Sequence, residues 1–115
     1  MASDCLFCQI AAGEIPATLV YQDDQVVAFN DIAPQAPHHV LIIPRRHIAT
    51  TLDLEDEDRD LVGHIFQVAG RIADDLGIAE EGFRLVNNCN EAGGQVVWHL
   101  HFHLLGGRAM NWPPG

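Results

Sequence analysis

The chain has 115 residues, of which 48% are hydrophobic, and it carries 6 Lys and Arg against 16 Asp and Glu, for a formal net charge of −10. This acidic balance excludes a binder of duplex nucleic acid, which needs many cations to face the phosphates. No apolar run reaches the ~18 residues of a membrane span, so we expect neither nucleic acid nor a membrane as a partner. The length suits one domain, which we expect to cover residues 1–115.

The N-terminal region combines a cysteine pair with a short apolar segment. Met1–Asp4 has no basic and no apolar stretch, so we expect no signal peptide. The 3 cysteines are odd in number and include the close pair Cys5 and Cys8, unlike a secreted disulfide framework. These features predict a soluble protein of a reducing compartment, the cytoplasm or alternatively the nucleus. Residues 6–12 are apolar enough for a short helix, which Gly13 would end.

The next part of the chain predicts three strands. Leu19–Tyr21 and Val26–Phe29 are short runs of apolar and β-branched residues with a polar turn between them. A loop with two prolines follows. His39–Ile43 is then an apolar, β-branched run that a proline stops, as expected for a buried strand.

A long helix is predicted over Asp53–Leu76. Asp53 can cap its N-terminus, apolar residues inside it follow helical spacing, and Gly77 can end it. Gly63 and Gly70 share one face of this helix and would let another backbone approach closely. That backbone would belong either to a helix of a second subunit or to the chain's own sheet.

The last third of the chain predicts two more strands, Phe83–Val86 and Val96–Leu105, joined by a loop rich in Asn and Gly. Most connections are too short for parallel crossovers, which favours antiparallel pairing. We therefore predict an α+β fold with a mainly antiparallel sheet of about five strands, one long helix and one short helix.

The strongest functional pattern is the alternation of His99, His101 and His103 with apolar residues. Alternate residues of a strand share a face, so the three histidines should lie together while the residues between them enter the core. Neutral imidazole can act as a nucleophile or proton donor near neutral pH. One metal ion could bind two adjacent members but hardly all three, so a metal-dependent hydrolase with an H-x-H pair is an alternative.

The segment His99–Leu105 matches the pattern His-φ-His-φ-His-φ-φ, with φ apolar, at every position, and it resembles the histidine triad (HIT) family. Further segments resemble its nucleotide-binding Hint branch and extend over nearly the whole chain: Gly13–Pro16, Asp31–Pro37, Ile43–Pro44, Gly93–Gln95, Gly106–Arg108 and Trp112–Gly115. The resemblance implies a HIT-like fold and a homodimeric purine nucleoside phosphoramidase. Such an enzyme hydrolyses the P–N bond of nucleoside 5′-phosphoramidates through a nucleotidyl-histidine intermediate.

The resemblance also implies roles for single residues. His101 would attack the α-phosphorus, while His103 and His39 would hold the phosphate oxygens. His38 competes with its neighbour for the last role, but the matching residues on either side select His39.

The implied substrate-binding residues are Asp31 at the ribose hydroxyls, Phe29 and Ile32 at the base, and Asn88, Gly94, Gln95 and Val96 around the phosphate and its leaving group. Many relatives carry a hydroxyl residue where this chain has Val96, whose side chain cannot donate a hydrogen bond. We therefore expect slower turnover or a different leaving-group preference.

Cys5 and Cys8 have the spacing of a zinc-binding pair. A structural zinc ion needs two further ligands, and the resemblance implies His47 and His99. The alternatives are two reduced thiols packed near the N-terminus, or a redox disulfide. We expect zinc as a structural cofactor and no cofactor for the chemistry itself.

Two other functions compete with the phosphoramidase. The chain could be a non-catalytic sensor or interaction protein that binds purine nucleotides, or it could hydrolyse dinucleoside polyphosphates. Substitution of His101 separates the sensor from the enzymes, because a sensor could bind nucleotide without it.

Overall fold

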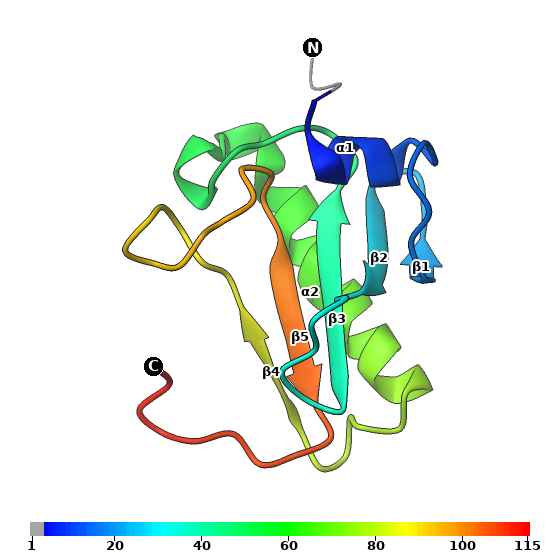
Figure 1. Cartoon of the computed structure of the whole chain (residues 1–115), viewed down its shortest axis with the longest axis vertical. Helices are drawn as coiled ribbons and strands as arrows, with labels where there is room; N and C mark the ends of the chain where they lie inside the picture. Colours follow the sequence, from blue (N-terminus) through cyan, green and yellow to red (C-terminus); the bar gives the residue numbers. More distant parts are fainter. Residues whose placement is uncertain (1–3) are drawn as a thin grey trace.

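The computed structural model describes residues 4–115. Met1–Ser3, on which the expectation of no signal peptide largely rests, lie outside the described residues. The sheet consists of β1 (Leu19–Gln22), β2 (Val26–Asn30), β3 (His38–Pro44), β4 (Phe83–Val86) and β5 (Phe102–Gly106). The strands lie in the order β1-β2-β3-β5-β4, and each neighbouring pair is antiparallel (Figure 1). The predicted α+β fold with an antiparallel sheet is confirmed.

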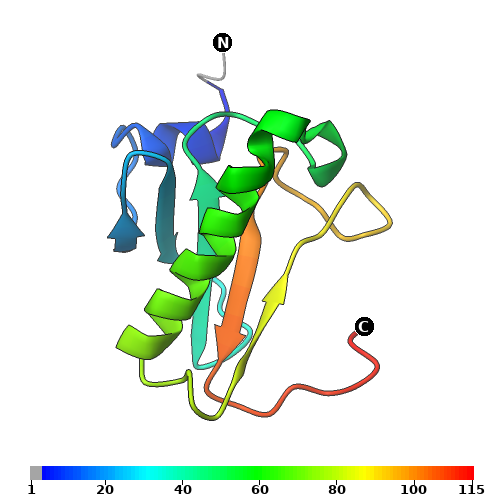
Figure 2. The same ribbon diagram turned by 180° about the vertical axis from the view of Figure 1, so that it is seen from behind.

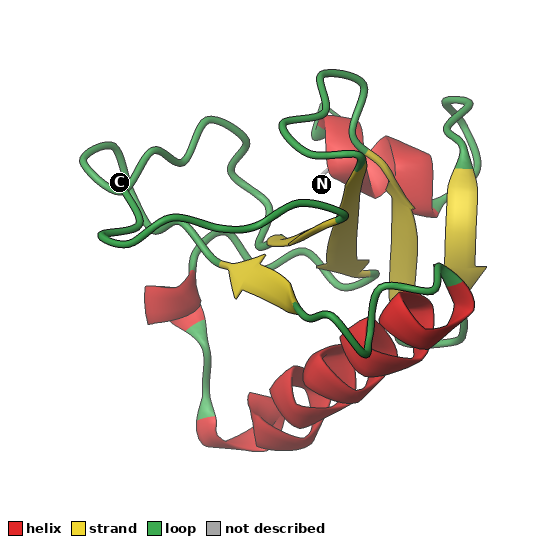
Figure 3. Cartoon of the chain, turned by 90° about the horizontal axis from the view of Figure 1, so that it is seen from below, coloured by secondary structure: helices red, strands yellow, loops and turns green. Residues whose placement is uncertain are grey.

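The two α-helices cover opposite faces of this sheet. The short α1 (Leu6–Ala11) lies on the face seen in Figure 1, and the long α2 (Arg59–Asp75) crosses the other face, as Figure 2 shows from behind. Figure 3 shows the sheet between the two helices. Side chains of β2 alternate accordingly, with Val26 and Ala28 in the core under α2 and Val27 and Phe29 in the smaller cluster beside α1. Because β2 and β3 are buried on both faces, their sequences are nearly continuous apolar runs.

The long helix begins later than the sequence predicts. It starts at Arg59, and two 3₁₀ turns, Thr51–Asp53 and Asp56–Asp58, precede it. The carboxylate of Asp53 accepts hydrogen bonds from the backbone N and the Oγ1 of Thr50, at 3.1 and 3.0 Å. Asp53 therefore completes the capping box of the first 3₁₀ turn, and its predicted role as the cap of the long helix is wrong.

The remaining helix predictions have mixed outcomes. The end of α2 agrees with the sequence, because Gly77 follows it with a φ of +75°, a value that favours glycine. Gly63 and Gly70 do not pack closely against the sheet, since a Cβ at either position would meet no atom within 4 Å. The prediction that these glycines allow close packing of the helix on the chain's own sheet is therefore wrong. No helix within residues 4–115 is long and apolar enough to cross a membrane.

The last strand is shorter than predicted. We expected a strand over Val96–Leu105, but β5 begins only at Phe102, and residues 96–101 are irregular. The backbone N of Leu100 donates to the carbonyl oxygen of Ile48 at 2.6 Å, outside the strand ladder. The segment that carries two of the three histidines is thus fixed by the chain just after β3.

Candidate functional site

The three histidines of the run lie on the α1 side of the sheet, although only His103 belongs to β5. Phe7 of α1 contacts the rings of His99 and His101, with centroid distances of 6.1 and 5.2 Å. The rings of His101 and His103 are 5.0 Å apart. The apolar residues between them lie in the core under α2, as predicted: Leu100, Phe102 and Leu104.

The backbone fixes the tautomer of His101. This residue is 5% exposed, and its Nδ1 lies 2.7 Å from the carbonyl oxygen of His99. Because a carbonyl oxygen only accepts, Nδ1 carries the ring proton and Nε2 keeps its lone pair. Burial lowers the pKa of His101, against the opposite effect of the carbonyl bond, so the ring is neutral near pH 7. His101 is therefore prepared to act as a nucleophile through Nε2.

A chain of hydrogen bonds gives His103 the opposite tautomer to His101, with the proton on Nε2. The backbone N of Gln35 donates to Nδ1 of His39 at 3.0 Å, so the proton of this ring lies on Nε2. That Nε2 donates to Nδ1 of His103 at 2.8 Å, which leaves His103 with its proton on Nε2. Both nitrogens of His39 are used inside the protein. The phosphate contact implied for His39 would require one of these bonds to break.

Burial keeps the rings of this group neutral. It lowers the pKa of His39 and, together with the neighbouring rings of His101 and His39, lowers the pKa of His103 to about 4. Near pH 7 His103 is thus a neutral hydrogen-bond donor at Nε2. A donor of this kind beside a nucleophile is suited to stabilise, by a hydrogen bond, a group that gains negative charge.

A cavity of about 830 Å³ lies beside these rings, within the size range of small-molecule sites. Its lining includes residues that the sequence had singled out: Phe29, Asp31, Ile32, Val96, His101 and His103. Three residues of α1 that the sequence had not indicated also line it: Leu6, Phe7 and Ile10. The walls are largely apolar, while the histidines and Asp31 supply polar atoms, an arrangement that suits a ligand with a flat apolar part and a charged part.

Asp31 serves the turn and the site at once. Its Oδ1 accepts from the backbone N of Ala33 at 2.8 Å, and its Oδ2 lies 3.4 Å from Nε2 of His39. Asp31, His39 and His103 bring one ligand atom each within 4.8 Å of one another. However, Nδ1 of His39 accepts and Nε2 donates, so this ring has no lone pair left for a metal ion. The group suits hydrogen bonding and proton transfer better than metal binding.

Three predicted substrate-binding residues belong to the loop after β4. Asn88, Gly94 and Gln95 are not among the residues that line it. The buried side chain of Gln95 accepts from the backbone N of Asn90 at 2.9 Å and donates to two backbone carbonyl oxygens. Gln95 thus shapes the loop, and the substrate contacts implied for these three residues stay predictions.

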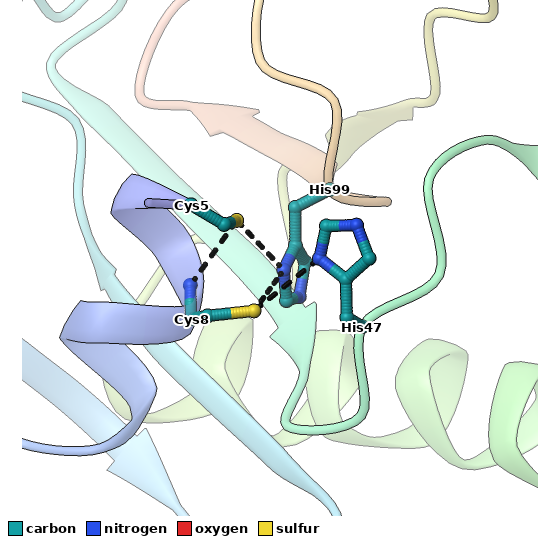
Figure 4. A group of neighbouring side chains, drawn as sticks. All are labelled: Cys5, Cys8, His47 and His99. Atoms are coloured by element: carbon teal, nitrogen blue, oxygen red, sulfur yellow. Dashed lines mark hydrogen bonds between the residues drawn. The ribbon is translucent and has the colours of Figure 1, made fainter. Parts of the chain in front are cut away.

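A second cluster lies at the end of α1. It consists of the four predicted metal ligands, Cys5, Cys8, His47 and His99, whose ligand atoms all lie within 4.8 Å of one another (Figure 4). Nδ1 of His99 is 3.4 Å from the Sγ atoms of both cysteines, and Nδ1 of His47 is 3.3 Å from Sγ of Cys8. All three cysteines of the chain are free, so the alternative of a disulfide is not realised in this structure.

The donors of this second cluster fit a zinc ion. His99 donates from Nε2 to the carbonyl oxygen of Pro44 at 2.7 Å, so its lone pair lies on Nδ1, the atom near the thiols. Two thiols and two imidazoles form a common set for tetrahedral zinc, whose ligand atoms are separated by about 3.3–3.8 Å. Burial, reinforced by Cys5, raises the pKa of Cys8 to about 11, so a metal ion must displace the thiol proton.

Comparisons with known proteins agree with this geometry. The model of the family described as the HIT domain matches residues 12–110. A purine nucleoside phosphoramidase of Escherichia coli (strain K12) is 51% identical over 110 residues, covering 96% of this chain and 92% of that protein. An uncharacterized HIT-like protein of Synechococcus elongatus is 50% identical over 115 residues, which is 100% of both chains.

Solved structures show the same fold. A HIT family hydrolase from Legionella pneumophila superposes with a TM-score of 0.95 at 57% identity, covering 96% of this chain and 99% of that one. A histidine triad protein from Clostridium difficile gives a TM-score of 0.92 at 49% identity, with 95% of both chains covered.

Proposed function

The chain belongs to the HIT family, and we propose that it is a purine nucleoside phosphoramidase, which hydrolyses the P–N bond of nucleoside 5′-phosphoramidates. One observation carries the proposal. Nδ1 of His101 is bonded to the carbonyl oxygen of His99, which leaves a neutral ring with a free Nε2 lone pair beside the cavity. The 51% identity to the phosphoramidase of Escherichia coli supports the same reaction.

In the proposed first step, Nε2 of His101 attacks the α-phosphorus, and the P–N bond breaks. The nucleotide is then bonded to Nε2 of His101, and the amine departs with a proton taken from the solvent. Meanwhile Nε2 of His103 keeps its proton and donates a hydrogen bond to a phosphate oxygen. In the second step water attacks the phosphorus, the P–Nε2 bond breaks, and the proton that the water loses returns to the solvent. The products are an amine and a nucleoside monophosphate, and both histidines return to their starting states.

The direct test is release of adenosine monophosphate from adenosine 5′-phosphoramidate. Wild-type protein should release it and His101→Ala should not. His38→Ala is the matched control and should react like the wild type, because His38 precedes His39 on β3 and so faces the other side of the sheet. Equal release by His101→Ala would contradict the proposal.

Two other results would favour the competing functions. Tight binding of adenosine monophosphate without any release by the wild type would favour a non-catalytic nucleotide-binding protein. A strong preference for diadenosine polyphosphates over the phosphoramidate would favour dinucleoside polyphosphate hydrolysis. In that case His101 would still be the nucleophile, but the leaving group would be a nucleoside phosphate.

We further propose a structural zinc ion on Cys5, Cys8, His47 and His99. The support is the spacing of the four ligand atoms and the tautomer of His99. When bound, zinc would crosslink α1 to the chain after β3 and to the histidine run. Protein purified without chelator should hold about one zinc per chain, and Cys8→Ser should hold little. Well under one zinc per wild-type chain would contradict this site.

A homodimer is the proposed assembly. β4 is an edge strand of the sheet, its residue Phe83 is partly exposed, and the exposed ring of Trp112 lies 6.0 Å from Cζ of Arg84 on the same strand. The C-terminal tail lies near this strand, since Arg84 donates to the carbonyl oxygen of Asn111 at 3.0 Å. Light scattering at micromolar concentration should give twice the mass of one chain, and the mass of one chain would contradict the dimer.

A further inference from the structure

The helix α1 belongs to the metal cluster and to the cavity at the same time. Cys5 directly precedes it and Cys8 lies within it, and both are members of the four-ligand cluster. From the same six-residue helix Leu6, Phe7 and Ile10 contribute to the wall of the cavity. Any shift of this helix therefore changes the cluster and the cavity together.

Phe7 connects the helix to other residues of the cavity wall. It is 5% exposed, and its ring meets Phe29 at 5.4 Å and His101 at 5.2 Å, both edge to face. Phe29 and His101 line the cavity too. Edge-to-face pairs depend on ring position, so the apolar wall keeps its shape only while α1 stays in place.

Packing of Phe7, Ile10 and Ala11 in the smaller apolar cluster and polar contacts at both ends hold α1 in that place. A helix of six residues is far too short to be stable by itself. At its C-terminal end Arg45 donates from Nη1 to the carbonyl oxygen of Ala11 at 2.8 Å. At its N-terminal end the polar contacts are those of the two thiols with His47 and His99, at 3.3–3.4 Å. Thiol–imidazole contacts are weak, whereas bonds to a zinc ion are strong.

We propose that the metal cluster and the apolar wall of the cavity are thermodynamically coupled through α1: zinc strengthens binding of the nucleotide base, and a bound nucleotide strengthens binding of zinc. The proposal rests on the zinc site and nucleotide cavity proposed above. Zinc fixes Leu6 and Phe7 because its ligands lie on either side of them. A base packed on these residues in turn orders the two cysteines. Because such coupling is reciprocal, both affinities change by one factor, about ten-fold.

The ligand itself can separate this route from a second one. The carbonyl oxygen of His99 also holds Nδ1 of His101, so the cluster has a link to the phosphate end of the site. Ribose 5-phosphate would reach the phosphate end but has no base to pack on α1. Coupling through α1 therefore predicts an effect on adenosine monophosphate and none on ribose 5-phosphate.

The test is isothermal titration of both ligands into zinc-loaded protein and into protein stripped by chelator. We expect stripping to raise the Kd of adenosine monophosphate about ten-fold and to leave the Kd of ribose 5-phosphate unchanged. Zinc competition with a chromogenic chelator should show the same factor between protein with and without adenosine monophosphate. Cys8→Ser should behave like stripped wild type. Cys89→Ser removes a thiol that is not part of the cluster and should keep the full zinc response.

The outcomes separate the proposals. One zinc per chain with equal affinities for adenosine monophosphate would overturn the coupling and leave the zinc site standing. Absence of zinc binding would remove the site and the coupling together. Equal weakening of both ligands, including loss of both by unfolding, would overturn the route through α1. Binding is measured without turnover, so failure of phosphoramidase activity would not affect this test.

Discussion

His99 and His101 lie two residues apart in one histidine run, yet they present opposite nitrogens. His99 donates from Nε2 to the carbonyl oxygen of Pro44 and keeps its lone pair on Nδ1, beside two thiols. His101 donates from Nδ1 to the carbonyl oxygen of His99 and keeps its lone pair on Nε2, beside the cavity. The backbone acceptor that each ring meets thus decides which one suits a metal ion and which one suits a phosphorus atom.

Neither residue type nor pKa makes this distinction. Burial lowers the pKa of both rings, so both are neutral near pH 7. His103 has a lowered pKa as well, but its Nδ1 is taken by His39 and its proton lies on Nε2. The difference between a ligand, a nucleophile and a donor in this run is a difference in hydrogen-bond partners.

The largest effect is expected from His103→Ala, which removes the donor beside the nucleophile. Loss of one donor to the negative charge that develops in the transition state typically slows the chemical step about 10²- to 10³-fold, so kcat for adenosine 5′-phosphoramidate should fall by about that factor. Steady-state kinetics with His38→Ala as the control would measure it. A rise in KM with unchanged kcat would show that His103 only binds the substrate.

His39→Ala should have a smaller effect, because His39 acts through His103. Without it Nδ1 of His103 loses its donor, which costs about 1–3 kcal/mol, or about five- to 150-fold in kcat. His39→Gln, whose amide can donate to Nδ1, should restore part of the rate. The pH dependence of kcat distinguishes a positioning role from a structural one. Because His39 contributes to the lowered pKa of His103, the acidic limb of that profile should move in His39→Ala. An unchanged profile with only a lower Tm would refute the positioning role.

Val96→Ser tests the leaving-group side of the cavity. Val96 is 82% exposed and lines the cavity together with His101 and His103. A hydroxyl there would add one hydrogen bond toward the scissile group, worth about two- to ten-fold in kcat/KM. Kinetics with several amine leaving groups should show faster turnover or an altered order of preference. Identical parameters for every substrate would show that Val96 has no influence.

The smallest effect concerns stability in mild acid. Because burial lowers the pKa of His39, His101 and His103, the unfolded chain binds more protons than the folded one between pH 6.5 and about 4. Stability should therefore be full above pH 6.5 and decrease as the pH falls toward 4, by about 1–2 kcal/mol at pH 5. Urea unfolding at pH 7 and pH 5 measures this difference, and His103→Ala should reduce it. Equal stability at both pH values would contradict the buried neutral state.

Much of the fold followed from short-range patterns. Apolar runs marked the strands, and Gly77 marked the end of the long helix. The start of that helix was missed because Asp53 bonds to Thr50 instead. The length of the last strand was missed because Leu100 bonds to Ile48 outside the ladder. Both errors come from contacts that alternation and helical spacing do not encode.

The prediction of the site had the same shortcoming, because some of its contacts are not encoded in residue patterns. The histidine pattern and the cysteine pair identified the residues that the fold brings together, including His47, which is distant from both in the sequence. Sequence reasoning missed Phe7 as a cavity residue, although its position between two metal ligands was a usable signal. It also missed the backbone N of Gln35, which sets the tautomer of His39, because a main-chain donor has no residue type to recognise.

The most direct test of the assignment is to trap the intermediate. Wild-type protein would be mixed with adenosine 5′-phosphoramidate, quenched within one turnover under alkaline conditions that preserve phosphohistidine bonds, and digested for mass spectrometry. We predict an adenylyl group on Nε2 of His101, and none on any histidine of the His101→Ala variant. Turnover without an adduct, or an adduct on His103 or His39, would contradict the account.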